Sequence, residues 1–406
     1  MGKTHRKTYL IITLLIILLL PMNVCAEDGM DVEFHAKRDT QLNLKNNENN
    51  LQRFIINAPY QFKYPDAVRG IYVSGKSAGS KRFHQLVNLV DSTELNAMVI
   101  DMKDDYGNLT FIPKGKTEYT KIAKNDISDP QKMMKILESK QIYPIARIVV
   151  FKDTVLAHSR ADLSFTQKDQ IWKNNRGEAF VNPFMKEVWE YNVDIAKMAA
   201  EMGFQEIQFD YVRFPEGFEK MDQILEYEVG DYSDLEMNNV QKRVEAVSDF
   251  VAYANKELEQ YDVDVSVDIF GYAATIPEAP GIGQNFSRIA ENVDVISSMI
   301  YPSHWSNNFF GIDMPDREPY RLVSEYAKVE NAVLDALESP PVSRPWLQDF
   351  EAPWLYSGKT KQYGKEEVEA QIKALYENNI HEFLLWNAGN VYSENVDYLL
   401  NGNKSS

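Results

Sequence analysis

The sequence predicts an α/β protein in which eight parallel strands and the helices between them close into a (β/α)8 barrel. From residue 68 onward, short apolar and β-branched runs alternate with longer amphipathic stretches, which is the pattern of repeated βα units. Eight such runs can be counted. The span from residue 68 to about residue 400 also accommodates the roughly 250 residues of such a barrel together with insertions.

The expected strands cover residues 68–74, 97–103, 143–151, 206–213, 263–270, 293–301, 343–350 and 382–387. The expected helices cover residues 81–92, 130–140, 185–202, 239–259, 319–337 and 365–378, and only the connection after the fifth strand, near residues 284–291, is short. An open doubly wound sheet is the alternative. Such a sheet normally has a glycine-rich phosphate turn after its first strand, but residues 74–79 have neither the P-loop nor the GxGxxG spacing.

The first 26 residues have the features of a secretory signal peptide. His5, Arg6 and Lys7 precede an apolar run over residues 10–20, and the close Val-Cys-Ala at residues 24–26 suits cleavage before Glu27. The run is shorter than the about 20 apolar residues that a membrane span needs. We therefore expect a secreted or cell-envelope-associated protein, with a retained N-terminal anchor as the alternative.

Residues 27–65 differ from the rest of the chain. The stretch 41–53 is rich in Asn and lacks a clear hydrophobic period, so we interpret residues 27–65 as a polar, flexible spacer or a peripheral cover. The barrel domain is expected over residues 66–400.

Composition excludes several classes of protein. Cys25, inside the signal peptide, is the only cysteine, so the mature chain has no thiol nucleophile, CxxC pair or cysteine zinc site. The formal net charge is −17, and removal of the signal peptide, which holds three cations and no acid, takes it to −20. So acidic a chain is a poor partner for nucleic acid or an anionic membrane, and neutral or cationic substrates fit better.

Polar and aromatic residues stand at the ends of the predicted strands, where the functional side chains of such a barrel gather. Trp172 and Trp354 lie in loops on the same predicted side, whereas Trp189 lies inside a helix and is interpreted as core. Because aromatic rings pack against the CH faces of sugars, this distribution favours a carbohydrate ligand. The residues expected to bind substrate are Asp101, Lys103, Arg213, Tyr301, His304, Trp305, Gln348, Trp386 and Asn387.

Two aspartates on neighbouring predicted strands form the candidate catalytic pair. Alternation along a strand puts Asp210 on the same side as Gln208, and Asp268 on the same side as Ser266. Because adjacent strands lie about 4.8 Å apart, the two carboxylates are expected near the roughly 5–5.5 Å separation of a retaining glycosidase. We assign Asp210 as the nucleophile and Asp268 as the acid/base.

Two alternatives to this pair remain open. The aspartates could instead cap the helices that follow or pair with Arg213. Asp349 and Glu351, after the seventh strand, are the reserve catalytic residues. If the seventh strand supplies the acid, the separation of the two carboxyl groups grows toward the inverting range.

Other chemistries leave little trace in the sequence. The histidines are scattered without HExxH or HxH spacing, and no G-x-S-x-G elbow follows a predicted strand. The acidic run at residues 101–105 contains Lys103, which favours an ion pair or a substrate contact over a metal site. We therefore expect neither a metal nor a cofactor, with calcium as a structural alternative.

The same strand ends resemble a bacterial glycoside hydrolase family with a TIM-barrel domain. The matching stretches are residues 69–75, 99–105, 207–215, 268–271, 299–305, 344–350 and 384–387, and the most specific is Phe-Asp-Tyr-Val-Arg-Phe-Pro at residues 209–215. The resemblance implies a (β/α)8 TIM barrel, a carbohydrate-active role and a functional carboxylate at Asp210. Alpha-amylase-like enzymes carry a Glu acid after the fifth strand, where this chain has Asp268.

These observations predict a glycoside hydrolase that cleaves a cell-surface or extracellular polysaccharide through a carboxylate pair. The alternative is a catalytically inactive, glycan-binding barrel of the cell envelope. A metal-dependent polysaccharide deacetylase is a third hypothesis, and it requires ligand His and Asp groups to converge. The expected partner is a carbohydrate substrate, with no nucleic acid and no protein partner inferred.

Overall fold

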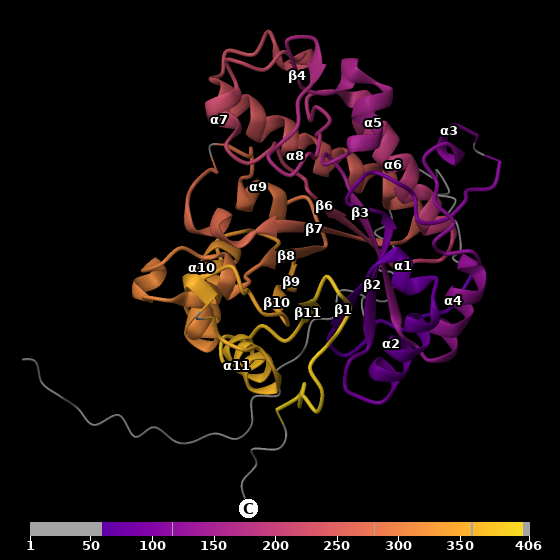
Figure 1. The fold of residues 1–406 in the computed structure, drawn as a ribbon, viewed down its shortest axis with the longest axis vertical. Coiled ribbons are helices and arrows are strands. Elements are labelled where there is room, and N and C mark those ends of the chain that lie inside the picture. The colour runs from indigo at the N-terminus through magenta and orange to yellow at the C-terminus, as the bar shows by residue number, and fades with distance from the viewer. Residues whose placement is uncertain (1–58, 116, 280, 359, 401–406) are drawn as a thin grey trace, which may run out of the picture. The chain divides into compact units, whose positions relative to one another are not determined.

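A closed ring of parallel strands forms the centre of the computed structural model, which describes residues 59–400 except 116, 280 and 359 (Figure 1). These residues belong to one compact unit, Leu44–Ser406. The strands β1, β2, β3, β6, β7 and β8 pair in that order, and β11 pairs with β1. Because β10 pairs with both β8 and β11, the ring is closed, and the predicted (β/α)8 TIM barrel is confirmed.

The bounds of the barrel strands agree with the eight predicted runs, with shorter ends. They are β1 (Arg69–Val73), β2 (Ala97–Lys103), β3 (Tyr143–Val149), β6 (Glu206–Asp210), β7 (Asp264–Phe270), β8 (Val295–Met299), β9 (Val342–Ser343), β10 (Trp346–Gln348) and β11 (Phe383–Trp386). A separate hairpin, β4 (Thr166–Gln167) and β5 (Gln170–Ile171), lies in the long connection between β3 and β6.

The seventh strand position is divided between β9 and β10. Pro345 interrupts it because proline has no N–H to donate to the ladder. The neighbouring backbone keeps the alignment, since the Arg344 N–H donates to the Ile296 carbonyl and the Leu384 N–H donates to the Pro345 carbonyl, each at 2.9 Å. The predicted strand 343–350 is therefore present in two short pieces.

Helices surround the barrel, one or more in each connection that the sequence predicted to be helical (Figure 1). The longer ones are α2 (Lys81–Asp91), α4 (Pro130–Ser139), α6 (Lys186–Glu201), α8 (Asn239–Leu258), α10 (Pro319–Leu334) and α11 (Lys365–Tyr376). The shorter ones are α1 (Gly75–Ala78), α3 (Thr117–Thr120), α5 (Thr154–Ser159), α7 (Phe218–Met221) and α9 (Phe286–Ala290). The short connection expected near residues 284–291 is α9.

Alternation along the strands divides the core into two parts. In β3, Tyr143, Ile145 and Arg147 point into the barrel, while Ala146 and Ile148 pack outward against the helices. Because successive side chains of a strand point to opposite faces, one apolar strand serves both layers. The inner layer is smaller and mixes apolar groups with charged ones.

The amino-terminal end of the barrel is sealed by a buried charge cluster. Arg344 donates to both carboxylate oxygens of Glu206, at 2.7 and 2.8 Å, and to Glu382 at 2.7 Å. Tyr64 covers this cluster, since its hydroxyl accepts from Arg344 and donates to Glu382, each at 2.9 Å. Residues 59–65, predicted as the end of the spacer, thus close the barrel floor, whereas residues 1–58 lie outside the described residues.

No helix among the described residues is long and apolar enough to span a membrane.

Candidate active site

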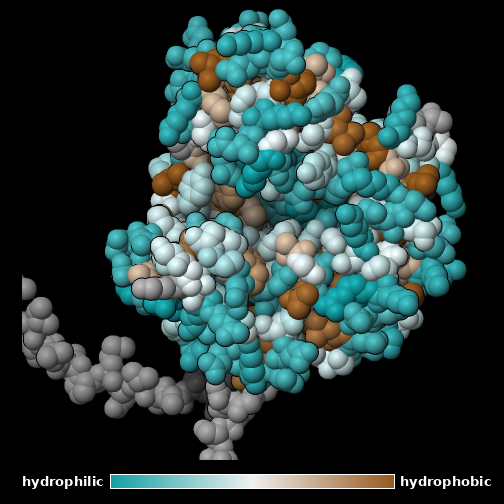
Figure 2. All heavy atoms as spheres, viewed as in Figure 1, coloured by the Kyte–Doolittle hydropathy of each residue, from teal (hydrophilic) through white to brown (hydrophobic). Residues whose placement is uncertain are grey.

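A deep pocket opens at the carboxyl ends of the barrel strands. Its cavity has a volume of about 1000 Å³. Figure 2 shows a hollow near the centre of this face, with tan residues on one side and teal residues on the other. The pocket residues come mainly from the ends of β3, β6, β7 and β8 and the loops that follow them. This is where a barrel of this kind presents its functional groups.

Arg147, from the middle of the barrel, is the centre of the charged part of the pocket. Its guanidinium donates to Asp210 Oδ2 from Nε at 2.9 Å and from Nη2 at 2.5 Å, and to Asp101 Oδ1 at 2.7 Å. Asp105 lies at 3.5 Å on the solvent side. All of these groups except Asp105 are buried, so the paired charges compensate each other's loss of water.

The surroundings give these acids different protonation behaviour. Burial raises the pKa of Asp101 to about 6 despite the opposing charge of Arg147, and the Tyr72 hydroxyl donates to the same carboxylate at 2.5 Å. Although partial burial opposes the shift, the charges of Arg147 and Lys152 lower the pKa of Asp105 to about 2. Asp105 therefore stays ionised at neutral pH.

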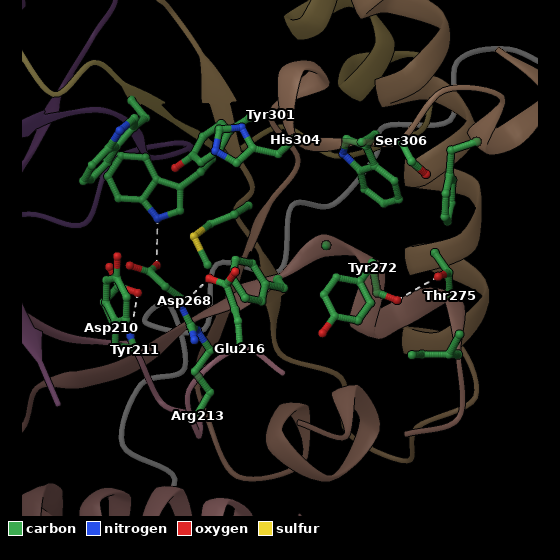
Figure 3. Close-up of a pocket in the computed structure, with 18 of the residues that line it drawn as sticks. Asp210, Tyr211, Arg213, Glu216, Asp268, Tyr272, Thr275, Tyr301, His304 and Ser306 are labelled. Carbon is green, nitrogen blue, oxygen red and sulfur yellow. Dashed lines mark hydrogen bonds and ion pairs between the residues drawn. The ribbon is translucent and has the colours of Figure 1, made fainter. Parts of the chain in front are cut away.

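Asp268 faces the same cavity from the next strand. Its Oδ1 accepts from the Trp346 indole at 2.7 Å, which orients the carboxyl group (Figure 3). The register pairs Phe209 with Val267, so Asp210 and Asp268 stand at the same level on adjacent strands. Burial, together with the charge of Asp210, raises the pKa of Asp268 well above its ordinary value. Asp268 is thus favoured as a proton donor next to an arginine-paired carboxylate.

A backbone constraint follows Asp210 directly. Tyr211 has φ +54°, a left-handed conformation that is uncommon for a tyrosine. Its N–H donates to Asp210 Oδ1 at 2.6 Å, and Lys152 lies 3.9 Å from the centroid of its ring. This turn ends β6 and explains why the strand stops at Asp210 instead of the predicted Arg213. Such strained residues cluster at functional sites.

Other predicted site residues also line the pocket. The Arg213 guanidinium lies 4.6 Å from the Phe270 ring centroid and donates to the carboxylate of Glu216 at 3.2 Å. Burial lowers the pKa of His304, which packs edge-on against the Tyr301 ring with centroids 5.3 Å apart. Of the predicted residues, those that line the pocket are Asp210, Asp268, Arg213, Tyr301, His304, Trp305 and Trp386.

Asp101 and Lys103, predicted together as substrate-binding residues, have separate roles. Asp101 is buried beneath Arg147 and reaches the cavity only through it. Lys103 is fully buried outside the barrel wall, where its ammonium pairs with Asp153 at 2.7 Å and donates to Asn192 of α6 at 3.0 Å. The position of Lys103 contradicts substrate binding, because a break in register between Asp101 and Lys103 turns it outward.

Gln348 and Asn387 lie behind the pocket wall and do not line the pocket, contrary to their prediction as substrate-binding residues. The fully buried Gln348 amide accepts from the Ser303 N–H at 2.9 Å and donates to Asp316 at 3.2 Å. Asn387 donates to the Asp349 carbonyl at 2.5 Å. Both therefore hold the loops of the site and make no direct contact with the cavity.

The reserve catalytic residues are also outside the pocket lining. Asp349 accepts from the backbone and the hydroxyl of Ser393 at 2.9 and 2.6 Å, and Glu351 is exposed. Neither faces the cavity that Asp210 and Asp268 share. The positions of these residues favour the pair on β6 and β7.

The tryptophans divide between the pocket, the surface and the core. Trp386 stacks on Tyr72, with ring centroids 4.1 Å apart, and Arg147 lies 5.3 Å from its ring centroid. Trp172 is half-buried and Trp354 is exposed, and neither lines the pocket. Trp189 is buried among helices, as its position in the sequence predicted.

Sequence reasoning missed Arg147, Tyr72, Trp346 and Glu216. A signal existed for Arg147, since a single arginine in an otherwise apolar strand is unusual and shares its side with the inward-facing Ile145. Trp346 was present in the motif at residues 344–350, but nothing in the sequence pointed it toward Asp268. Glu216 directly follows the motif at residues 209–215, and it joins Asp105, Asp210 and Asp268 as a fourth carboxyl group at the pocket lining.

Within the described residues, no three His, Cys, Asp or Glu side chains are grouped so that they could hold a metal ion. The acids around Arg147 are instead organised by its guanidinium. The arrangement offers one carboxylate paired with a cation and, beside it, one carboxyl group with a raised pKa. Two carboxyl groups in such different surroundings can take different roles in acid–base chemistry.

Comparisons with known proteins give the family and the fold of this chain. A family model described as "Putative glycosyl hydrolase domain" matches residues 70–392. No curated protein matches the chain. Among solved structures, a hypothetical protein from Ruminiclostridium thermocellum is 31% identical, covering 49% of this chain and 96% of its own, with a TM-score of 0.42.

Two more distant structures show similarity of fold. The glycoside hydrolase domain of PgaB (BpsB) from Bordetella bronchiseptica is 14% identical, with a TM-score of 0.53, covering 79% of this chain and 94% of that domain. A beta-galactosidase from the psychrophilic Marinomonas ef1 is 10% identical, with a TM-score of 0.50, covering 79% of this chain and 54% of the galactosidase.

Proposed function

Since this chain belongs to the family of glycosyl hydrolase domains, we propose that it is a retaining glycosidase whose nucleophile is Asp210 and whose acid/base is Asp268. The observation that carries the proposal is the difference between these two neighbours in one pocket. Asp210 is paired with Arg147, whereas the pKa of Asp268 is raised by burial and by the charge of Asp210. Retaining glycosidases use two carboxyl groups about 5–5.5 Å apart, which is near the spacing of adjacent strands.

In the first step, an Asp210 oxygen attacks the anomeric carbon while Asp268 gives its proton to the glycosidic oxygen. The bond between the anomeric carbon and that oxygen breaks, the alcohol leaves, and the sugar is held as an ester of Asp210. In the second step, Asp268 takes a proton from water, the water oxygen attacks the anomeric carbon, and the ester bond breaks. Both carboxyl groups then return to their starting states.

Residues near the pair support the chemistry in distinct ways. Arg147 fixes one oxygen of Asp210 with two hydrogen bonds, and the Tyr211 N–H holds the other oxygen. The Trp346 indole positions Asp268. Such preorganised donors cost no reorganisation at the moment of reaction.

We also propose that the substrate is a cell-surface or extracellular polysaccharide. The support is the signal-peptide pattern of residues 1–26, together with a pocket rich in aromatic side chains. The amino-terminal sequence of the protein recovered from the native host tests export. A mature chain that begins at Glu27 supports it, and an uncleaved chain found in the cytoplasm argues against it.

The decisive assay measures the release of reducing ends from cell-wall and extracellular glycans by the protein without residues 1–26. We expect activity in the wild type and a loss of at least about 10³-fold, or roughly 4 kcal/mol of transition-state stabilisation, in Asp210→Asn. Asp349→Asn is the matched control, since it alters a buried carboxyl group outside the pocket lining, and it should stay active. Glycan binding without turnover in the wild type would favour the catalytically inactive barrel.

Chemical rescue separates the roles of the two aspartates. With an activated aryl glycoside of the sugar that the panel identifies, azide should restore turnover to both Asp210→Ala and Asp268→Ala. The first variant should give a glycosyl azide of inverted configuration, because one displacement occurs. The second should give the retained product, because azide then attacks the ester of Asp210. The opposite pairing would reverse our assignment of the roles.

A further inference from the structure

The pocket is divided into two chemically different halves. The half formed by β2, β3, β6 and their loops is charged, and includes Asp105, Arg147, Arg176 and Arg213. The half formed by the loops after β7 and β8 and by α10 is mainly carbon, and is lined by Phe270, Ile276, Trp305, Phe309, Phe310 and Val329. In Figure 3, Tyr272, Thr275 and Ser306 mark this second half, on the far side of Asp268 from Asp210.

Three aromatic rings of this half pack against one another and form an aromatic wall. The Trp305 ring contacts Phe309 and Phe310, with centroids 4.6 and 5.5 Å away, and the two phenylalanine rings lie 4.8 Å apart. Gly271 makes room for the indole, because a Cβ at this position would lie 3.0 Å from the Trp305 ring and 2.9 Å from the Met299 carbonyl oxygen. A larger residue at position 271 would therefore displace the wall.

The turn that carries these rings has a strained backbone at Phe310. Asn308, Phe310 and Gly311 have φ values of +67°, +52° and +69° in one short turn. A phenylalanine in the left-handed region is costly, and such conformations persist where the surroundings enforce them, often at ligand sites. The strain therefore points to a use for the exposed ring faces of Phe309 and Phe310.

The chemistry of this half suits an apolar group better than a second sugar. The hydroxyls of a sugar need hydrogen-bond partners when they leave water. Here the Thr275 hydroxyl already donates to the Tyr272 carbonyl at 2.7 Å, and Ile276 and Val329 add aliphatic side chains to the aromatic wall. The polar side chains of Tyr272, His304 and Ser306 also line this half. Burial of an alkyl or aryl group in such a cavity is favourable in proportion to its apolar area.

Its place in the barrel identifies which part of the substrate it would hold. The strands follow one another in the order β6, β7 and β8, so Asp268 lies between Asp210 and the aromatic wall. A general acid stands beside the oxygen of the leaving group, because it gives that oxygen its proton. With Asp268 as the acid, the aromatic half is on the leaving-group side.

We propose that this aromatic half is a leaving-group subsite for an apolar aglycone, an alkyl or aryl group joined through oxygen to the terminal sugar of the polysaccharide, so that hydrolysis of this bond also frees a reducing end. The inference rests on the proposed glycosidase function for one step, the placing of the aromatic half on the leaving-group side. The affinity of the aromatic half for apolar groups does not depend on catalysis, and it can be measured with simple alcohols.

Binding of 1-butanol, 1-pentanol, 1-hexanol and benzyl alcohol, followed by tryptophan fluorescence and calorimetry, tests the subsite without any catalysis. We expect the dissociation constant to fall about fourfold for each added methylene, as for full burial of a CH₂. Phe310→Asn should weaken 1-hexanol binding at least about fivefold, and asparagine suits the left-handed backbone at that position. Trp354→Ser, which alters an exposed indole outside the pocket lining, should bind like the wild type.

The outcomes separate the two proposals. Tighter binding with chain length favours an alkyl aglycone, and tighter binding of benzyl alcohol favours an aryl one. Equal binding by wild type and Phe310→Asn, or no binding of any of these alcohols, would overturn the subsite even if the protein cleaves glycosides. Alcohol binding in a protein that cleaves neither the glycans nor their alkyl and aryl glycosides would leave the subsite intact and refute the proposed hydrolysis.

In an active enzyme, 1-hexanol should also be a better acceptor than methanol at equal concentration. An alcohol in the subsite replaces water in the second step, so that Asp268 takes its proton and an alkyl glycoside forms. The ratio of hexyl to methyl glycoside should fall at least about fivefold in Phe310→Asn and remain unchanged in Trp354→Ser. An unchanged ratio in Phe310→Asn would overturn the proposal.

Discussion

Two buried arginines stand at opposite ends of the same barrel, and each is held between carboxylates under a tyrosine. At the amino-terminal end, Arg344 is paired with Glu206 and Glu382, and Tyr64 covers them. At the carboxyl end, Arg147 is paired with Asp101 and Asp210, and Tyr72 donates to Asp101. The residue types match closely, and it is the second cluster whose Arg147 and Asp210 line the active-site pocket.

The difference lies in what covers each cluster. The floor cluster is closed by residues 59–65, and its charges bind to each other and to the Tyr64 hydroxyl. The upper cluster has Asp105 on its solvent side, and Asp210 and Arg147 both line the pocket. A buried ion pair is weak evidence of function by itself. An ion pair with one face open to a cavity can instead hold a charged group ready for a substrate.

The largest expected effects come from removing each arginine. In Arg344→Met, the unpaired carboxylates should cost about 3–5 kcal/mol of unfolding free energy, measured in urea, while kcat of the folded protein stays near the wild-type value. In Arg147→Met, we expect a similar loss of stability and also a loss of kcat/KM of about 10²–10³-fold. Equal losses of activity in the two variants, at temperatures where each is folded, would contradict the proposal that Arg344 acts on stability alone and Arg147 also acts on catalysis.

A pH effect of intermediate size should come from Asp101. Because its folded-state pKa of about 6 lies above 3.8, the folded protein binds more protons than the unfolded chain between pH 4 and 6. The contribution of Asp101 to the unfolding free energy should therefore fall by about 3 kcal/mol as the pH rises through this window. Asp105, whose pKa is lowered to about 2, changes its protonation at pH values below this window.

The variant Asp101→Asn isolates this contribution, because every other titrating group is shared with the wild type. The difference in unfolding free energy between the two proteins, measured at pH 4, 5, 6 and 7, should change across pH 4–6 and then remain constant. A difference that is the same at all four pH values would show that Asp101 titrates normally.

The smallest effects are expected from the two tyrosines. Tyr64→Phe removes hydrogen bonds to Glu382 and Arg344 and should cost about 1.5–3 kcal/mol of stability with no change in kcat. Tyr72→Phe removes the bond to Asp101 and should cost a similar amount, with an additional decrease of a few-fold in kcat. Thermal denaturation measures the stability of the two variants, and initial rates measure their kcat. A decrease in kcat for Tyr64→Phe and none for Tyr72→Phe would show that the cluster at the barrel floor, and not the one at the pocket, supports catalysis.

The sequence alone predicted the order of the strands and the grouping of two aspartates in one site. The order of eight strands was visible because apolar runs of strand length alternate with amphipathic stretches, and both layers of the core depend on that alternation. Asp210 and Asp268 could be assigned to one site because adjacent parallel strands end at the same edge. The motif at residues 209–215 named the most specific segment, although it gave no sign of the left-handed turn at Tyr211.

The tertiary structure alone decided which polar groups face the cavity. A break in register after Asp101 turns Lys103 outward, and alternation by itself would have kept both on one side. The closed ring brings Trp346 to Asp268, which lies 78 residues away in the chain, and the register between β3 and β6 brings Arg147 to Asp210, 63 residues away. Pairing across such distances depends on how the barrel closes and packs, and local patterns in a sequence carry no information about either.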